Sequence, residues 1–150
     1  WEQQISSDEY LRRVHLLQSC LTARGVDYRY HESDLSRLEA VLARGDRRLS
    51  RVLLRAHELG CKLDGWDEYF RYDLWLQAFS DCGVDPDFYT TRGFAEDEIL
   101  PWQTMDVGVS RAFFLRERAQ AYQSVTTPDC RTKCAGCGAR ALSERGVCDE

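Results

Sequence analysis

The chain has 150 residues, of which 43% are hydrophobic. This length allows one real core that buries roughly 70% of the unfolded surface. The formal net charge of −5 argues against a general polyanion binder, although a local basic face can exist within an acidic whole. No apolar run approaches bilayer length and no signal peptide opens the chain, so we expect a cytoplasmic protein without membrane contact.

The seven cysteines are an odd number in a chain without secretory features. Reduced thiols and metal ligation therefore explain them better than a complete disulfide framework. Three of them lie within apolar helical patterns and are expected to be small, buried, hydrophobic residues: Cys20, Cys61 and Cys82.

The first predicted element is a helix over about residues 7–24. Ser6 and Glu9 form a capping-box pattern at its start, and Gly25 ends it. Apolar residues then alternate with polar ones from residue 26 to 30, the period of a half-buried strand. A lone strand needs a partner, so this short extended segment is either an unpaired strand or, more simply, an extended connection.

Two further helices are predicted to form a hairpin. The first starts at Ser33 or Asp34 and ends at Gly45, and the second runs from Asp46 to Gly60. Each carries apolar residues at helical spacing. The second helix has its apolar face at Leu49, Val52, Leu53, Ala56 and Leu59.

A fourth helix, rich in aromatic residues, is predicted to end at Gly83. Residues 84–109 show no sustained period and form a long irregular loop; such loops are often functional or docked onto another surface. Ser110 then caps a last helix, with Arg116 and Glu117 facing outward. Its inward residues are predicted to be Phe113, Phe114, Ala119 and Tyr122.

These patterns predict a mainly α fold, a small helical domain of about five helices with one short extended segment. We expect the helical domain to cover residues 1–125. A cysteine-rich tail follows over residues 126–150, and much of its end is polar in composition.

Five arginines recur at offsets of three, four, seven and eleven, so a continuous helix would place most of them in one stripe. Such a stripe could bind RNA phosphates or an acidic protein, or it could be a solvated face paired with neighbouring carboxylates. The candidate partner-binding residues are Arg44, Arg47, Arg48, Arg51 and Arg55.

The tail holds the strongest chemical signal. Cys130, Cys134 and Cys137 are separated by three residues and then two, and glycines at 136 and 138 permit a tight loop. Three thiolates at this spacing can hold a four-iron cluster, which makes an iron–sulfur cluster the leading interpretation. Zinc is the alternative, although only Cys134 and Cys137 form the pair typical of zinc sites, and a metal-free set of thiols is the third. Cys148 could complete either metal site.

Four sequence blocks resemble the C-terminal region of uncharacterised radical S-adenosylmethionine (radical SAM) proteins that carry an N-terminal cobalamin-binding-type domain. The resemblance runs from Trp1 to about Gly138. Its blocks are Leu38–Leu49, Gly60–Trp66, Pro101–Ser110 and Thr127–Cys130.

This resemblance implies that a catalytic barrel, with its own cluster and S-adenosylmethionine, and a cobalamin-type domain lie upstream in the same parent chain. The chain would then be an accessory domain that docks on the barrel. The motif of radical SAM enzymes precedes a barrel of roughly 200 residues, so the late position of Cys130, Cys134 and Cys137 indicates an auxiliary cluster. In similar proteins a further cysteine closely follows the pair that corresponds to Cys137-Gly138. Here Ala139 and Arg140 occupy those positions, so Cys148 becomes the candidate for the fourth ligand.

Two functions therefore stay open from sequence. The first is an accessory domain of a radical SAM enzyme whose substrate is unknown or RNA- or ribosome-linked. The second is a non-catalytic interaction module with structural zinc and an arginine-rich face for RNA or an acidic protein.

Overall fold

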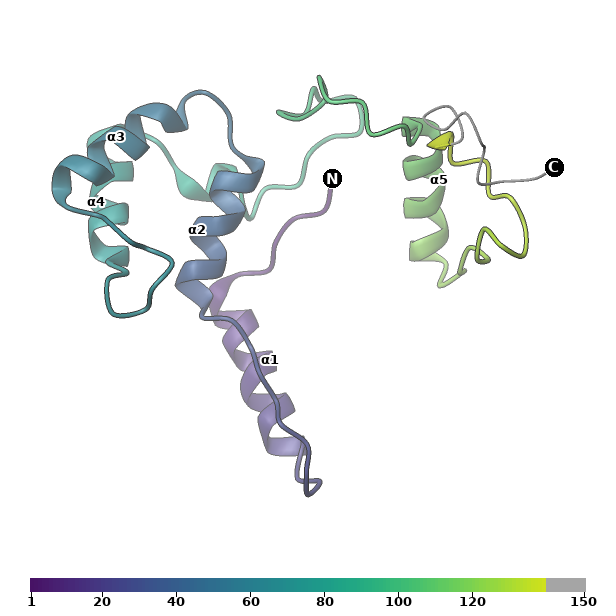
Figure 1. Cartoon of the computed structure of the whole chain (residues 1–150), viewed down its shortest axis with the longest axis horizontal. Coiled ribbons are helices and arrows are strands. Elements are labelled where there is room, and N and C mark those ends of the chain that lie inside the picture. The colour runs from purple at the N-terminus through teal and green to yellow at the C-terminus, as the bar shows by residue number, and fades with distance from the viewer. Residues whose placement is uncertain (140–150) are drawn as a thin grey trace. The chain divides into compact units, whose positions relative to one another are not determined.

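The computed structural model describes residues 1–139 and divides the chain into two compact units, residues 1–101 and the part from Trp102 onward. The described chain contains five α-helices, one short 3-10 helix and no strand, which confirms the predicted mainly α class (Figure 1). The elements are α1 (Ser7–Cys20), α2 (Ser33–Arg44), α3 (Leu49–Leu59), α4 (Tyr72–Asp81), η1 (Pro86–Phe88) and α5 (Arg111–Tyr122). Within these residues, none of the helices has the length and apolar character needed to cross a bilayer.

The division differs from the boundary drawn from sequence at residue 125. It falls at Pro101, so α5 belongs to the same unit as the cysteine loop. The polar, glycine-rich composition of the tail suggested that the cysteines are separate from the helical domain. The contacts that join them to α5 cannot be recognised in the sequence.

Side-chain caps start two of the helices as predicted. The Ser6 hydroxyl accepts from the Glu9 backbone N–H at 3.3 Å, and Ser110 accepts from Phe113 at 3.2 Å. α3 ends at Gly60, whose φ of 103° allows its N–H to reach carbonyls of the last turn.

α1 ends at Cys20, four residues earlier than predicted, because Leu21 leaves the helical region with φ −86° and ψ 76°. Only Val14 of this helix is buried, and Leu16 and Leu17 are exposed. A helix gains most of its stability from packing, and the C-terminal half of α1 has little. The same exposure overturns the prediction for Cys20, which is exposed rather than buried.

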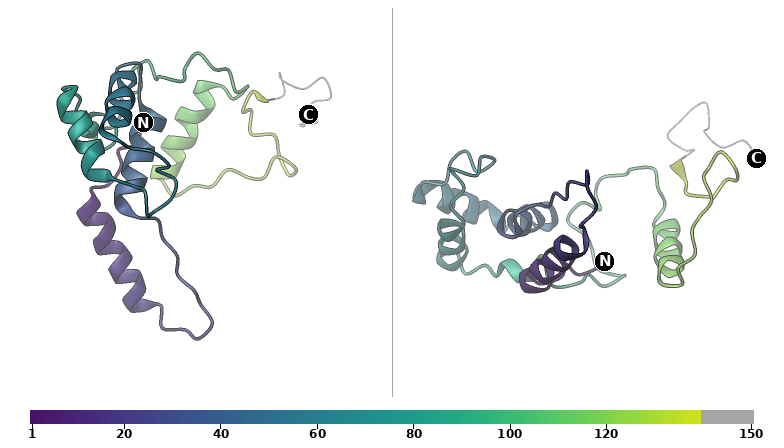
Figure 2. Two further views of the ribbon diagram at one scale, coloured as in Figure 1. Left: turned by 60° about the vertical axis from the view of Figure 1, so that its left-hand side comes forward. Right: turned by 90° about the horizontal axis from the view of Figure 1, so that it is seen from below.

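The core of the first unit lies between α2, α3 and α4, and α3 and α4 run side by side in both views of Figure 2. Cys61 is buried in this core, and Cys82 is half-buried and packs against the core. Both positions agree with the predicted hydrophobic role of these cysteines. The remaining core side chains are Leu38, Val41, Leu49, Val52, Ala56, Trp75, Ala78, Phe79 and Tyr89.

The residues after α4 do not form a loose loop in the first unit. The Gln4 N–H donates to the Thr90 carbonyl at 2.9 Å, and the Phe94 N–H donates to the Trp1 carbonyl at 3.0 Å. Thr90 is 1% exposed. The stretch from residue 84 to 101 is thus docked on the N-terminal segment of its own unit, and the remainder of the predicted loop leads into α5.

The segment at residues 26–30 is an extended connection, since no strand pairs with it in the described chain. Its aromatic rings, Tyr28 and Tyr30, stack on each other at 5.9 Å. The prediction of a buried apolar face on α5 was wrong. None of its residues is buried, and Phe114 and Tyr122 are 43% and 67% exposed, because the cysteine loop that accompanies this helix offers few apolar side chains.

Candidate metal centre

The three predicted cysteine ligands follow one another in the loop after α5. Cys130 and Cys134 are exposed and Cys137 is half-buried, and no disulfide joins the cysteines of the described chain. Cys148 lies outside the described residues. Within residues 1–139 no three His, Cys, Asp or Glu side chains lie close enough together to hold a metal ion. The loop therefore brings the thiols into one segment without gathering them around one point.

Two of the sulfur atoms accept hydrogen bonds from the backbone of their own loop. The Gly136 N–H donates to Cys134 Sγ at 3.4 Å, and the Ala139 N–H donates to Cys137 Sγ at 3.4 Å. In each case the donor lies two residues after the cysteine. Hydrogen bonds of this kind tune a metal that thiolates bind, but the described residues do not gather three ligands around one point.

Glycine is required in this loop for two separate reasons. Gly136 and Gly138 have φ of 64° and 96°, a region that other residues rarely adopt. A Cβ on Gly138 would also lie 3.1 Å from the Gly108 carbonyl oxygen. A Cβ at this distance is tighter than an ordinary contact, so a side chain at position 138 would require the loop or Gly108 to shift by a few tenths of an ångström.

The loop is fastened to the segment around α5 at three points. The Ser110 N–H donates to the Cys137 carbonyl at 2.7 Å. The guanidinium of Arg116 donates to the Ala135 carbonyl, between the second and third cysteines. Upstream of the first cysteine, the Thr127 hydroxyl donates to Glu117. The cysteine segment is thus held at both ends and in the middle.

Between α5 and the loop lies an open cleft of about 330 Å³. Its lining includes Cys134 from the loop and Arg116, Glu117 and Gln120 from α5. One carboxylate oxygen of Glu117, Oε1, is buried and has no hydrogen-bond partner among the described residues.

The predicted arginine stripe is interrupted, because residues 45–48 form a turn between α2 and α3. Arg44 faces inward and donates to the carbonyls of Glu2 at 2.8 Å and Arg92 at 3.1 Å. Its burial, and then the charge of Arg92, lower the pKa of Arg44. This residue holds the fold together and is not part of an open basic face.

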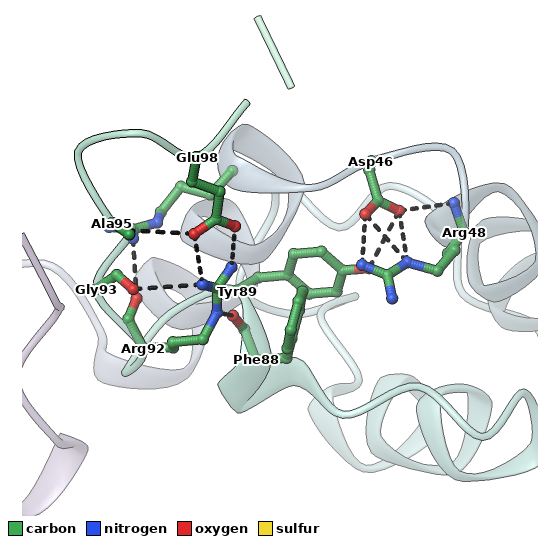
Figure 3. A network of polar contacts seen from close by, with 9 residues as sticks. Asp46, Arg48, Phe88, Tyr89, Arg92, Gly93, Ala95 and Glu98 are labelled. Carbon is green, nitrogen blue, oxygen red and sulfur yellow. Dashed lines mark hydrogen bonds and ion pairs between the residues drawn. The ribbon is translucent and has the colours of Figure 1, made fainter. Parts of the chain in front are cut away.

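Two more of these arginines are paired within the first unit. Arg48 binds Asp46 at 2.6 Å, which raises the pKa of Arg48, and its guanidinium lies 4.9 Å from the centre of the Phe88 ring (Figure 3). Arg55 binds Asp81 at 2.7 Å and Glu58 at 3.2 Å, and both contacts raise its pKa.

Arg47 and Arg51 differ from the other three. Both are exposed, and neither side chain has a hydrogen-bond or ion-pair partner among the described residues. The structure therefore leaves two of the five predicted residues available to an external partner.

Sequence reasoning missed the contribution of α5 to the cysteine loop. It assigned Arg116 and Glu117 to a solvated face, yet both side chains contact the loop. The only available signal was their adjacency on a helix directly before the cysteines, since a periodic pattern cannot show which face a later loop will cover.

Comparison of this chain with protein-family models, with curated proteins and with solved structures yields no match.

Proposed function

We propose that this chain is a C-terminal accessory domain of a radical SAM enzyme and that Cys130, Cys134 and Cys137 bind an auxiliary iron–sulfur cluster. The sequence blocks that resemble such proteins support the enzyme class. The substrate of the parent would be a molecule linked to RNA or the ribosome, and its barrel would bind S-adenosylmethionine, with cobalamin in the upstream domain.

One observation carries the metal-binding part of the proposal. Cys134 and Cys137 each accept a backbone N–H two residues later, within a loop that hydrogen bonds fasten to α5 and its N-terminal end. An auxiliary cluster can bind substrate or pass electrons, and its potential depends on hydrogen bonds to sulfur. The residues of this chain would hold the thiolates and limit how far the loop can move.

The test is anaerobic reconstitution of the full-length protein with iron and sulfide, followed by metal and sulfide analysis. Changing the three cysteines together to alanine is expected to remove one cluster per chain. The matched control is Cys20→Ala, because Cys20 is an exposed thiol in α1, outside the loop. An unchanged cluster count in the triple variant would refute the proposal.

Zinc is the second candidate for the same site, and the Cys134–Cys137 pair favours it, because a two-residue spacing between cysteines is typical of zinc. Elemental analysis of protein purified without added metal distinguishes the two. Zinc at one equivalent, lost in the triple alanine variant, would assign a structural site and an interaction module instead of an electron-transfer or substrate-binding one.

Such a module would bind RNA or an acidic protein through Arg47 and Arg51. Both are exposed and have no side-chain partner among the described residues, which is the observation that favours this function. RNA binding that weakens as salt rises, and weakens further in an Arg47→Gln, Arg51→Gln variant, would support it. Arg29→Gln is a matched control, since its side chain is 89% exposed.

A further inference from the structure

The loop that joins α3 to α4 exposes three large apolar side chains (Figure 1). Leu63 and Trp66 are each 63% exposed, and Tyr69 is 52% exposed. The loop reaches the core of the first unit through Cys61 and Phe70, near its two ends, so core packing does not explain the three exposed side chains. Tryptophan and tyrosine are enriched among the residues that carry most of the binding energy in protein interfaces.

The backbone of this loop follows a defined path. The Trp66 N–H donates to the Leu63 carbonyl at 3.0 Å, and the Tyr69 N–H donates to the Trp66 carbonyl at 2.9 Å. Turns of this kind bring Cα atoms three residues apart to within about 7 Å, so the three side chains extend from neighbouring positions. We call these three side chains the apolar loop patch. Leu63 has a φ of 58°, a conformation that bulky residues rarely adopt, so the loop keeps a large apolar side chain where the backbone disfavours one.

The charged residues of the loop are mainly acidic. Asp67 and Glu68 are exposed, and neither has a hydrogen-bond or ion-pair partner among the described residues. Asp64 is half-buried in the same loop, and Lys62 is the one cation in the sequence from residue 60 to 70. The apolar loop patch therefore lies among carboxylates that the rest of the first unit does not neutralise.

The negative charge at this end of the unit also acts on a core residue. Burial, and then the charges of Asp64 and Asp73, raise the pKa of the Cys61 thiol. Arg71 binds Asp73 at 2.9 Å, so that pair adds no net charge to the loop.

This charge decides which kind of partner fits the apolar loop patch. RNA phosphates and anionic lipid headgroups would be repelled by the carboxylates. A second copy of the chain, docked through the same patch, would bring Asp67 and Glu68 close to their own copies across a two-fold axis. Like charges that face each other in an interface cost free energy. A protein segment with lysine or arginine around apolar side chains matches both the charge and the apolar character of the loop.

We infer that Leu63, Trp66 and Tyr69 form a docking surface for a basic amphipathic segment of another protein. Trp66 and Tyr69 pack among the apolar side chains of that segment, and Asp67 and Glu68 bind its lysine or arginine side chains at the rim. This inference goes beyond the proposed function, because the surface belongs to the first unit and the cysteine loop to the second.

Peptide binding to the full chain, measured by fluorescence anisotropy, tests the inference. The probe is a labelled synthetic helix with leucines on one face and lysines and arginines on the other. One comparison peptide carries glutamate in place of the basic residues, and another carries serine in place of the leucines. The basic amphipathic peptide should bind, and each comparison peptide should bind at least about tenfold more weakly.

Variants of the loop assign the binding to this surface. Trp66→Ala and, separately, Tyr69→Ala are expected to weaken binding of the basic amphipathic peptide about tenfold or more. The paired change of Asp67 to Asn and Glu68 to Gln should slow association and make binding less sensitive to salt. Circular dichroism of each variant checks that helix content is retained, so that lost binding is not lost folding.

Two matched controls lie elsewhere in the first unit. Leu54→Ala removes an apolar side chain of α3 that is 61% exposed, and Glu39→Gln removes an exposed carboxylate of α2. Both should bind the basic amphipathic peptide like the unmodified chain.

The inference is overturned if the basic amphipathic peptide does not bind the unmodified chain, or if it binds Trp66→Ala and Tyr69→Ala with unchanged affinity. It is also overturned if phosphatidylserine vesicles or single-stranded RNA bind the chain and Trp66→Ala abolishes that binding. A dimer in analytical ultracentrifugation that Trp66→Ala dissociates would assign the patch to a second copy and likewise refute it.

Discussion

Arg92 holds Glu98 through two parallel contacts of 2.8 Å, and its guanidinium also lies 4.3 Å from the centre of the Phe88 ring (Figure 3). The centre of the Phe94 ring lies 4.8 Å from the same guanidinium. Planar guanidinium groups combine bidentate pairing with stacking on aromatic faces, which a lysine cannot do. This arrangement explains why a stretch without helical or strand periodicity has a defined path in the first unit.

We expect Arg92→Ala to lower the free energy of unfolding of the first unit by about 1–2 kcal/mol, since two contacts with aromatic rings are lost. Chemical denaturation followed by circular dichroism measures the change. The control is Arg29→Ala, whose partner Asp27 is 71% exposed; surface pairs contribute little, so this variant should unfold like the unmodified chain. Equal stability of all three proteins would contradict the stabilising role of Arg92.

Core packing predicts a contrast between two leucines of α3. Leu49 is 5% exposed, whereas Leu54 is 61% exposed. Leu49→Ala is expected to cost about 2–4 kcal/mol through lost burial and the cavity that remains. Leu54→Ala should change stability by less than about 0.5 kcal/mol. Urea unfolding of both variants measures these losses of stability. Similar losses in the two variants would mean that another part of the protein covers the exposed face of α3.

The Asp46–Arg48 pair predicts a dependence of stability on acid. The hydrogen bond from Arg48 lowers the pKa of Asp46 from 3.8 to about 2. Because the folded pKa is depressed, the stabilisation is present above pH 3.8 and disappears as the pH falls toward 2. In Asp46→Asn, the free energy of unfolding should therefore depend less steeply on pH between pH 2 and pH 3.8.

Denaturation at a series of acidic pH values measures this slope. Glu9 also has its pKa lowered to about 2, by Arg12 and then Arg13, so part of the acid dependence should persist in Asp46→Asn. Asp27→Asn serves as the control for removing a surface carboxylate. An Asp46→Asn profile as steep as that of the unmodified chain would show that this pair contributes nothing to acid stability.

Glycine substitutions distinguish backbone strain from crowding at the cysteine loop. Gly138 and Gly25 both have positive φ, 96° and 86°, but only at Gly138 would a Cβ meet another residue. Alanine at either position should destabilise the chain by about 1–2 kcal/mol. Only Gly138→Ala should also lower iron, zinc or cobalt binding, because the loop must move away from Gly108. Equal metal affinity in both variants would argue against this crowding.

The helices show which features can be predicted from residues that are close together in the sequence. The caps at Ser6 and Ser110 and the glycine end at Gly60 were predictable, since each depends on neighbours within four residues. The length of α1 was not, because residues 21–24 would be helical only if another element packed against them. The offsets of the arginines assumed one continuous helix, and the turn at residues 45–48 interrupts the helical phase between α2 and α3.

The candidate site was likewise only partly predictable from the sequence. The spacing of Cys130, Cys134 and Cys137 was visible at once, because all three thiols lie in one short segment. The partners of that segment, Arg116 and Glu117, could not be assigned, since the fold alone decides which helix face a later loop covers.

By itself the sequence determined the helical class, the positions of most helix ends and the thiol-rich character of the tail, because these depend on residues close together in the chain. Only the tertiary structure decided that Arg44 turns inward, that residues 84–101 dock on the N-terminal segment, and that the cysteine loop returns along α5. Those features join residues far apart in sequence, and the hydrogen bonds and packing that stabilise them exist only once the chain has folded.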